Sequence, residues 1–364
     1  MSDDSSPLPW TTRQWDDLRA VALESARKSR VASTFLPLVG PLPADQATVP
    51  SNWMSHNDDR QPGEPPLRLE VRAGKTLQLV TISCNVYLRG SEIADPDLDS
   101  AKSMVRRVGE LLGRLEDAII FHGIESDMRD FCPRNGARAL VQPEIYTVSG
   151  GRDLTGLLQA PDTDFWDRSR REPLKSKVDK ASDAEQKAAA PGADEQANEA
   201  NLAAQEALRR DTMFVRVGDP DEANPSPIFD AIVKAVQKLE TQGHFGPFAV
   251  VLGHTLFSDA TRPSRSLVLP SDRLAEFLDG RRILRSGMLP AEDGVVVALG
   301  GQPIELVLAH DVDVKFLQVT TEPRYVLRVF ERFVLRIKEL DAVCRLLSTD
   351  EFPTPGFVPR RARG

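Results

Sequence analysis

The chain has 364 residues, of which 41% are hydrophobic, enough for a sizeable core in one large domain or in two or three smaller ones. Its formal net charge of −8 argues against a general nucleic-acid-binding protein. No stretch approaches the roughly 20 apolar residues of a membrane-spanning helix, and the N-terminus lacks the basic and apolar regions of a signal peptide. We therefore expect a soluble, cytoplasmic protein without a membrane partner.

The first element predicted from the sequence is an amphipathic helix. Thr11 or Thr12 is a suitable N-terminal cap, and the helix should run to about Ser33. Apolar side chains recur on one face at helical spacing, namely Trp15, Leu18, Val21, Ala22 and Ala26.

A polar arm and two strands should follow this helix. Residues 43–66 are rich in Pro, Asn and Asp, which predicts a loop or an extended arm. Residues 67–71 and 76–86 alternate well enough to predict two strands joined at Gly74. Because a hairpin without its own core is only marginally stable, we expect this one to pack on a partner.

A long helix is expected from about Ser100 to His122. Its apolar face consists of Val105, Val108, Leu112, Leu115, Ile119 and Ile120. Glu116 and Asp117 resemble a catalytic acid pair, but adjacent helical residues point about 100° apart and cannot flank one substrate atom. We expect a structural or salt-bridging role for both residues.

The segment 161–211 differs in composition from the rest of the chain. It is rich in Ala, Glu, Lys, Asp and Gln and almost lacks large apolar residues, so it cannot bury enough surface to offset the entropy of ordering. We interpret it as an insertion, either disordered or a polar helical hairpin, with a specific docking element as the alternative.

Residues 227–299 predict a compact α/β unit. An amphipathic helix begins near Ile228 and should end at Gly243, and an apolar strand is expected at 248–252. A second helix should carry Leu274, Phe277 and Leu278 on one face, and a second strand is expected at 295–299. Residues 307–347 then alternate apolar and polar side chains with the period of strands.

The sequence contains no recognisable catalytic constellation. Neither a zinc-protease histidine pair nor a nucleophile elbow, a P-loop or a dinucleotide glycine pattern occurs. The three cysteines lack metal-ligand spacing. The five histidines are scattered and should be structural or surface residues: His56, His122, His244, His254 and His310. We expect no catalytic, cofactor or metal site.

Short motifs distributed along the chain resemble the encapsulin shell proteins of the linocin or bacteriocin family. Near the N-terminus they are PLPWTTRQW and STFLPLVGP, and the long helix ends with the pattern E-D-x-x-I-F-x-G. Later pieces are FDAIVKAV, GPFAVVL, DRLAEFLDGRR, VVVALGG, IELVLAHDVDVKF and LRVFERFVLRI. The resemblance covers about 10–41, 95–123 and 213–347 and is weak at 42–94.

The resemblance implies an α+β phage major capsid protein fold of the Hong Kong 97 type, with a peripheral domain, an axial domain and an extension loop. The implied division is an N-terminal helix on the inner face at 1–41, the extension loop at 42–94, the peripheral domain with its long helix at 95–160, the polar insertion at 161–211, a mainly axial domain at 212–306, closing strands of the peripheral domain at 307–347 and a disordered tail at 348–364.

The resemblance also implies a function and partners. Encapsulin subunits assemble into an icosahedral shell that encloses a cargo enzyme, commonly a ferritin-like iron oxidase for iron storage or a dye-decolourising peroxidase. The expected partners are copies of this chain and a cargo protein bearing a C-terminal targeting peptide, with no nucleic acid. No cofactor is implied for the shell subunit, and we expect it not to be an enzyme.

Candidate site residues follow from position within the family pattern. Val31, Phe35 and Leu38 are expected on one side of a groove for the cargo peptide, with Phe333 and Leu335 on the other. For each of the five, a plain core role is the alternative. Arg262 and Arg265 lie in the connection that borders the pore where five subunits meet in the family, although exposed loop arginines are common.

Two other interpretations remain at this point. A prophage major capsid protein would share the fold but package DNA, and the acidic net charge and the encapsulin-type N-terminal helix argue against it. A soluble enzyme with an unrecognised site is the third interpretation.

Overall fold

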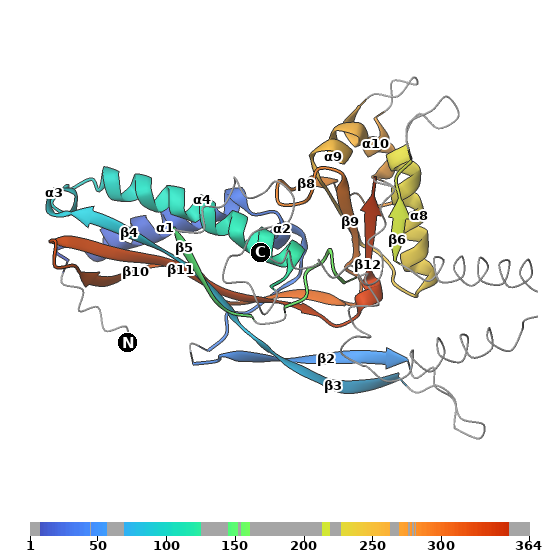
Figure 1. The fold of residues 1–364 in the computed structure, drawn as a ribbon, viewed down its shortest axis with the longest axis horizontal. Coiled ribbons are helices and arrows are strands. Elements are labelled where there is room, and N and C mark those ends of the chain that lie inside the picture. Colours follow the sequence, from blue (N-terminus) through green and yellow to red (C-terminus); the bar gives the residue numbers. More distant parts are fainter. Residues whose placement is uncertain are drawn as a thin grey trace, which may run out of the picture.

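The computed structural model describes residues 8–43, 45–56, 69–124, 145–151, 154–160, 213–218, 227–262, 269–275, 277–278, 280 and 282–348. The expected insertion at 161–211 and the expected tail at 348–364 lie outside these residues, except for Ser348. The described part forms two lobes, each built on a five-stranded sheet, and a separate two-stranded hairpin (Figure 1). Within it, no helix is both long and apolar enough to cross a membrane.

The first lobe consists of a five-stranded sheet covered by two helices (Figure 1). Its strands, in spatial order, are β1 (Leu38–Val39), β10 (Ile304–Val319), β11 (Arg324–Ile337), β4 (Val80–Arg89) and β5 (Tyr146–Gly150). The helices are α1 (Thr12–Ser29) and α4 (Asp99–His122), and α3 (Gly90–Ile93) connects β4 toward α4. The expected period of two is confirmed in the middle of β11, where Leu327, Val329 and Phe333 are buried and the even-numbered residues between them are only partly buried.

Helix α1 begins as the sequence predicts. The Thr11 side chain accepts a hydrogen bond from the backbone N–H of Gln14, and the Gln14 side chain accepts one from the N–H of Thr11. The helix ends at Ser29, however, and not near Ser33. Arg30 adopts an extended backbone and its side chain is buried. A separate short helix, α2 (Ala32–Phe35), follows.

Two glycines of α4 allow α1 to pack closely against it. A Cβ atom added to Gly109 would lie 2.5 Å from the carbonyl oxygen of Ala22, and one added to Gly113 would lie 2.7 Å from that of Ala26. Both distances are shorter than the contacts that real Cβ atoms make. The two glycines are four residues apart, so they lie on the same face of α4.

The second lobe contains the α/β unit expected from the sequence. Its sheet, in spatial order, is β6 (Phe214–Arg216), β12 (Val343–Leu347), β9 (Asp293–Ala298), β7 (Phe248–Leu252) and β8 (Leu284–Arg285). Its helices are α8 (Pro227–Thr241), α9 (His254–Thr261) and α10 (Pro270–Leu274). Strand β7 has the predicted bounds, and β9 begins two residues before the predicted strand.

The helix predicted to carry Leu274, Phe277 and Leu278 is α10, and it is shorter than predicted. It ends at Leu274, and the N–H groups of Phe277 and Leu278 both bond to the carbonyl of Leu274 in turns. Helix α9, which precedes it, is not predicted from the sequence. The turn closes with a bond from the N–H of Gly280 to the carbonyl of Ala275, where Gly280 has a φ of 75°. Leu278 is buried as expected, whereas Phe277 is exposed.

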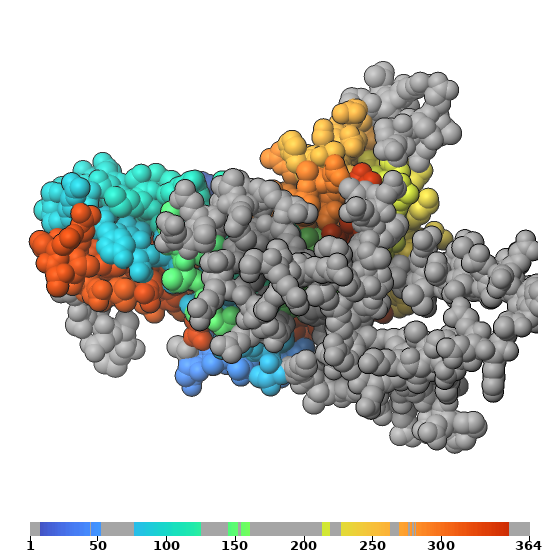
Figure 2. All heavy atoms as spheres, in the orientation of Figure 1, coloured from blue at the N-terminus to red at the C-terminus, as the bar shows by residue number. Residues whose placement is uncertain are grey.

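The arm predicted at 43–66 contains a strand. Strand β2 (Thr48–His56) pairs with β3 (Leu69–Gln78), so Gly74 lies within a strand and does not join two. Pro50 falls in a two-stranded sheet whose strands each have a free edge, which is where proline is tolerated. The register shifts next to Pro50, so that Gly74 belongs to a bulge. In the space-filling view the base of this hairpin lies at the lower edge of the described atoms (Figure 2).

We predict that Gly109→Ala and Gly113→Ala each destabilise the subunit by about 1–3 kcal/mol, the usual cost of overpacking. This cost should exceed the gain of roughly 1 kcal/mol that alanine normally brings to a helix. Gly90→Ala is the control, because nothing lies within 4 Å of the added methyl group. The measurement is the midpoint of denaturant unfolding, and equal midpoints for all three variants would contradict the close packing.

Candidate functional site

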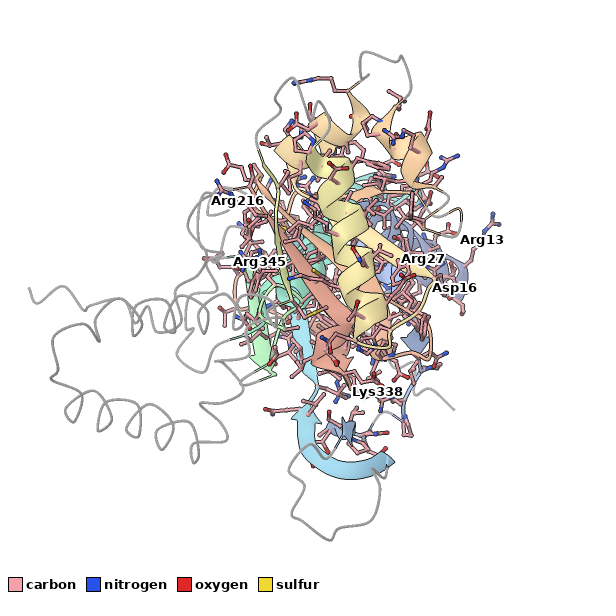
Figure 3. The ribbon with its side chains drawn as sticks, turned by 90° about the vertical axis from the view of Figure 1, so that its right-hand side faces the viewer. Arg13, Asp16, Arg27, Arg216, Lys338 and Arg345 are labelled. Atoms are coloured by element: carbon pink, nitrogen blue, oxygen red, sulfur yellow. The ribbon has the colours of Figure 1, made fainter. Side chains whose placement is uncertain are left out.

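A buried ion cluster fixes the chain just after α1. The guanidinium of Arg30 lies 2.9 Å from Glu331, 3.1 Å from Glu116 and 3.2 Å from Asp311. Glu116 and Glu331 are fully buried, and the Arg30 side chain is 5% exposed. The cluster therefore joins α4, β10 and β11 to the end of α1. Arg27, labelled in Figure 3, approaches Asp311 at 3.5 Å from the exposed side.

The cluster carries more carboxylates than cations. Burial, with repulsion from a neighbouring carboxylate, raises the pKa of Glu116 to about 7, and Arg30 acts against this shift. Burial and repulsion from Glu116 raise the pKa of Glu331 well above its ordinary value. One oxygen of each side chain, Glu116 Oε1 and Glu331 Oε2, accepts no hydrogen bond from any residue that the structure describes. The native cluster therefore retains protons to a higher pH than the unfolded chain does.

Asp117 has a different structural role from its neighbour. Its carboxylate accepts hydrogen bonds from the backbone N–H groups of Val31, at 2.8 Å, and Ala32, also at 2.8 Å. These groups begin α2 and have no partner within that helix. The structural role predicted for Glu116 and Asp117 agrees with these contacts, and together they set the sharp turn between α1 and α2.

A cavity of about 1040 Å³ opens beside this turn. It lies between α1, α4 and the loop after β8 in the second lobe. Its lining residues are Val21, Glu24, Ser25, Lys28, Ser29, Val31, Arg106, Glu110, Arg114, Asp117, His254, Arg285, Ser286, Gly287 and Met288. The cavity is thus formed by both lobes and is large enough to hold a short peptide segment.

The uncompensated charges in the cavity are mainly positive. Glu24 is bound by Lys28 at 2.5 Å, and Glu110 is bound by Arg107 at 3.0 Å. Within the described part of the chain, Arg106 and Arg114 make no ion pair, although Arg106 lowers the pKa of Glu24 after the larger effect of Lys28. The cavity therefore favours a ligand that carries acidic groups.

The second lobe adds a further cation to this lining. Arg285, at the end of β8, lies over the ring of Phe257 with its guanidinium carbon 5.9 Å from the ring centre. Its charge adds to that of the two arginines on α4, so positive groups face the cavity from both lobes.

The predicted cargo-peptide residues are not all brought together. Val31 is half-buried and lines the cavity. Leu38 is 54% exposed on β1, and the register of the sheet aligns it with Leu306 and then Leu335 on the neighbouring strands. Phe35 is buried, and Phe333 and Leu335 are almost completely buried in this chain, so these three are core residues here.

The two predicted pore arginines differ in what the structure describes. Arg262 follows α9, is exposed and lies 3.7 Å from Asp259. Arg265 lies outside the described residues.

The sequence pattern alone does not single out the arginines of the cavity. Arg106, Glu110 and Arg114 are four residues apart along α4, which is a signal for one polar helical face. The contribution of Arg285 depends on the approach of the second lobe, 171 residues later in the chain than Arg114, and no local pattern reveals it.

Comparison with known proteins bears on the identity of this fold. Residues 167–334 match the family model described as an encapsulating protein for peroxidase. The chain is 38% identical over 128 residues to the type 1 encapsulin shell protein EncA of Myxococcus xanthus (strain DK1622). The resemblance to encapsulin shell proteins is confirmed. The alignment covers 35% of this chain and 44% of EncA, so the chain spans less than half the length of that relative.

The likeness in fold to capsid-type proteins covers more of the chain. The virus-like particle from Pyrococcus furiosus, a crystal structure, is similar with a TM-score of 0.51 and 14% identity, over 92% of this chain and 100% of that one. The expected α+β fold of the phage major capsid type is confirmed. The encapsulin motifs at 10–41 and 95–123 lie outside the family-model match, which begins within the segment interpreted as an insertion.

We predict that the free energy of unfolding falls as the pH rises from about 5 to 8. The pKa of Glu116 is about 7 in the native state and ordinary in the unfolded chain, so the native state binds more protons across this window. Glu116→Gln, which is neutral throughout, should flatten the decline by roughly 2–3 kcal/mol.

The control for this measurement is Glu110→Gln, an acid on the same helix that is partly exposed and bound by Arg107. It should keep the pH dependence of the parent protein. Denaturant unfolding at several pH values measures the effect, and an unchanged slope in Glu116→Gln would contradict the assignment.

Proposed function

We propose that this chain is the shell subunit of an encapsulin compartment, a closed icosahedral cage that holds a cargo protein. The observation that carries the proposal is the similarity of one chain both to an encapsulin shell protein in sequence and to a virus-like particle subunit in fold. Its activity is assembly and recognition, without bond chemistry, a nucleic-acid partner or a membrane. By symmetry, the number of subunits is sixty or a multiple of sixty.

The hairpin of β2 and β3 is proposed as the extension loop that packs on neighbouring subunits. Its base is fixed to β11, because Arg332 donates a hydrogen bond to the carbonyl of Gln46 at 2.9 Å and Arg336 donates one to that of Pro50 at 3.3 Å. Beyond this base the two strands pair mainly with each other. A two-stranded sheet is marginally stable in isolation, so contact with a second copy would stabilise it.

The cavity between α1, α4 and the second lobe is proposed as the site of the cargo protein's targeting peptide. Val31 supplies an apolar contact, and burial of one such side chain contributes about 1.5–3 kcal/mol. Arg106, Arg114 and Arg285 supply charge that complements acidic groups of the peptide, including its terminal carboxylate. A cargo of the ferritin-like iron-storage class or of the peroxidase class would carry such a peptide at its C-terminus.

We predict that deleting residues 52–65 leaves a folded subunit but weakens or alters the particles. The fixed base, residues 48–51, remains, and the core of the first lobe, as far as the structure describes it, contains none of the deleted residues. Circular dichroism checks the fold, and the thermal stability and diameter of particles measure assembly. Particles of unchanged diameter and stability would remove the proposed role of the hairpin.

We predict that the double variant Arg106→Glu, Arg114→Glu retains at least tenfold less cargo than the parent shell, because reversal of two charges costs more than the roughly 1.4 kcal/mol that a tenfold change requires. Val31→Asp should have a similar effect. The matched control is Arg13→Glu, an exposed arginine on α1 that does not line the cavity.

The amount of native partner that co-purifies with assembled shells measures this effect. Full loading of the double variant and of Val31→Asp would place the cargo site elsewhere.

A further inference from the structure

A histidine lies between two carboxylates where the two lobes of the chain join. His244 follows α8 in the second lobe and begins the loop that leads into β7. Glu339 and Asp341 lie in the connection from β11 of the first lobe to β12 of the second, at the short helix η2 (Leu340–Ala342). The histidine and the two acids thus belong to segments about 95 residues apart in the sequence.

The connection between β11 and β12 is itself tied to the first lobe. The N–H of Lys338, which is labelled in Figure 3, donates a hydrogen bond to the carbonyl of Pro303 at 2.8 Å, just before β10. The side chains of Lys338 and Arg336 both bind the carboxylate of Glu305 on β10. A side-chain contact between this connection and the loop before β7 therefore bears on how the two lobes are held together.

The two carboxylates lie against different nitrogens of the same imidazole ring. Nδ1 of His244 is 3.4 Å from Glu339 Oε2, and Nε2 is 3.0 Å from Asp341 Oδ1. The histidine side chain is 7% exposed, whereas those of Glu339 and Asp341 are 25% and 50% exposed. Nε2 is closed to solvent and has no hydrogen-bond partner within the described residues, so the charge of Asp341 is what compensates its N–H.

Only a protonated ring suits both of these contacts. A neutral imidazole carries a proton on one nitrogen and a lone pair on the other, whereas an imidazolium carries protons on both. With a carboxylate at each nitrogen, a neutral ring would always turn one lone pair toward a negatively charged oxygen. The geometry therefore favours the imidazolium, which forms an ion pair on each side.

The elements packed around the ring add little further charge to it. Residues 245–253 and 299–303, which form β7 with its flanking loops and the turn beside it, contain no titratable side chain. Glu240 on α8 is exposed, and burial raises the pKa of the Cys344 thiol on β12 to about 12, so this thiol stays neutral. The remaining charged groups bind partners of their own, namely Lys238 of α8 the carbonyl of Phe214, Arg345 of β12 the carboxylate of Asp293, and Arg336 and Lys338 the carboxylate of Glu305.

The pKa of His244 moves in the direction that this geometry requires. Burial lowers it, but the contact with Asp341 and the charge of Glu339 outweigh burial, so that the pKa lies above its ordinary value. A histidine whose pKa is raised by folding stabilises the fold below its ordinary pKa of about 6.5. This stabilisation is lost as the pH rises through the native pKa.

We propose that protonated His244, clamped between Glu339 and Asp341, is a pH-sensitive latch that holds the two lobes in one relative position. While the ring is protonated, the latch ties the loop between α8 and β7 to the connection between β11 and β12. When the ring loses its proton, one of the two contacts becomes repulsive, and the loop and the connection separate more readily. The latch lies within one subunit, so its operation requires neither cargo nor closure of a shell.

The test follows ring exchange and backbone amide exchange of the full-length protein by mass spectrometry, from about pH 5 to 9. Exchange of the ring carbon-bound hydrogen reports the protonation of each histidine. His244 should keep its proton to a higher pH in the native protein than in the same chain unfolded by denaturant. As the ring loses its proton, amide protection at 242–246 and 338–342, corrected for intrinsic rates, should fall at least about fivefold, the effect expected from loss of two part-exposed ion pairs.

Three variants separate the parts of the latch. Asp341→Asn and Glu339→Gln each remove one carboxylate and should lower the pH at which His244 loses its proton. His244→Gln cannot be charged, so its protection at the two segments should be reduced and should no longer change with pH. Glu240→Gln is the matched control, because it removes one negative charge from an exposed position on α8, and it should behave like the parent protein.

Loss of the His244 proton at the same pH in the native and the unfolded chain would overturn the latch. The same holds for an unchanged value in both Asp341→Asn and Glu339→Gln, or for parental pH dependence of protection in His244→Gln. Asp341 is half-exposed, so Asp341→Asn keeps the test valid if His244→Gln does not fold. Because the amide readout is local to the two segments, it separates the latch from proton binding at the cluster around Arg30.

Discussion

The arrangement of the first lobe depends on the buried guanidinium of Arg30. It joins the end of α1 to Glu116 on α4 and to Glu331 on β11. Loss of one partner from such a cluster leaves an uncompensated buried charge, which typically costs about 3–5 kcal/mol. A hydrophobic substitute would avoid that cost but would not specify where α1 ends. We therefore infer that the main effect of the cluster is to fix the geometry of the turn, and that its contribution to the stability of the lobe is smaller.

The turn set by Arg30 and Asp117 links the fold to the proposed function. It stops α1 beside the cavity, places Val31 in the cavity wall and directs the chain into β1, which joins the edge of the first sheet. The close contact of α1 with Gly109 and Gly113 holds the helix against the face of α4 that leads to Asp117. A binding surface between α1 and α4 is thus built on rigid elements, as precise recognition requires.

Local patterns in the sequence are sufficient to predict the helices and strands that bury a continuous apolar face. Strand β7 and the apolar faces of α1, α4 and α8 can be predicted because periodicity alone determines which side chains enter the core. The structural role of Glu116 and Asp117 can also be predicted, since adjacent helical residues diverge. The end of α1 cannot be predicted in this way, because the partners of Arg30 lie 86 and 301 residues away in the sequence. Likewise, the positive lining of the cavity depends on the approach of the two lobes, and periodicity carries no information about that approach.

The hairpin of β2 and β3 is another place where the sequence prediction is wrong. Strand β2 contains a proline and polar residues, which a two-stranded hairpin tolerates because each strand has a free edge. The pattern places Gly74 in a turn, whereas it belongs to a bulge.

Closure of this chain into an icosahedral shell is tested most directly by electron microscopy of the purified full-length protein, together with its mass in solution. We expect closed hollow particles of uniform diameter whose mass corresponds to sixty subunits or a multiple of sixty. Small monodisperse monomers without particles would contradict the proposed function.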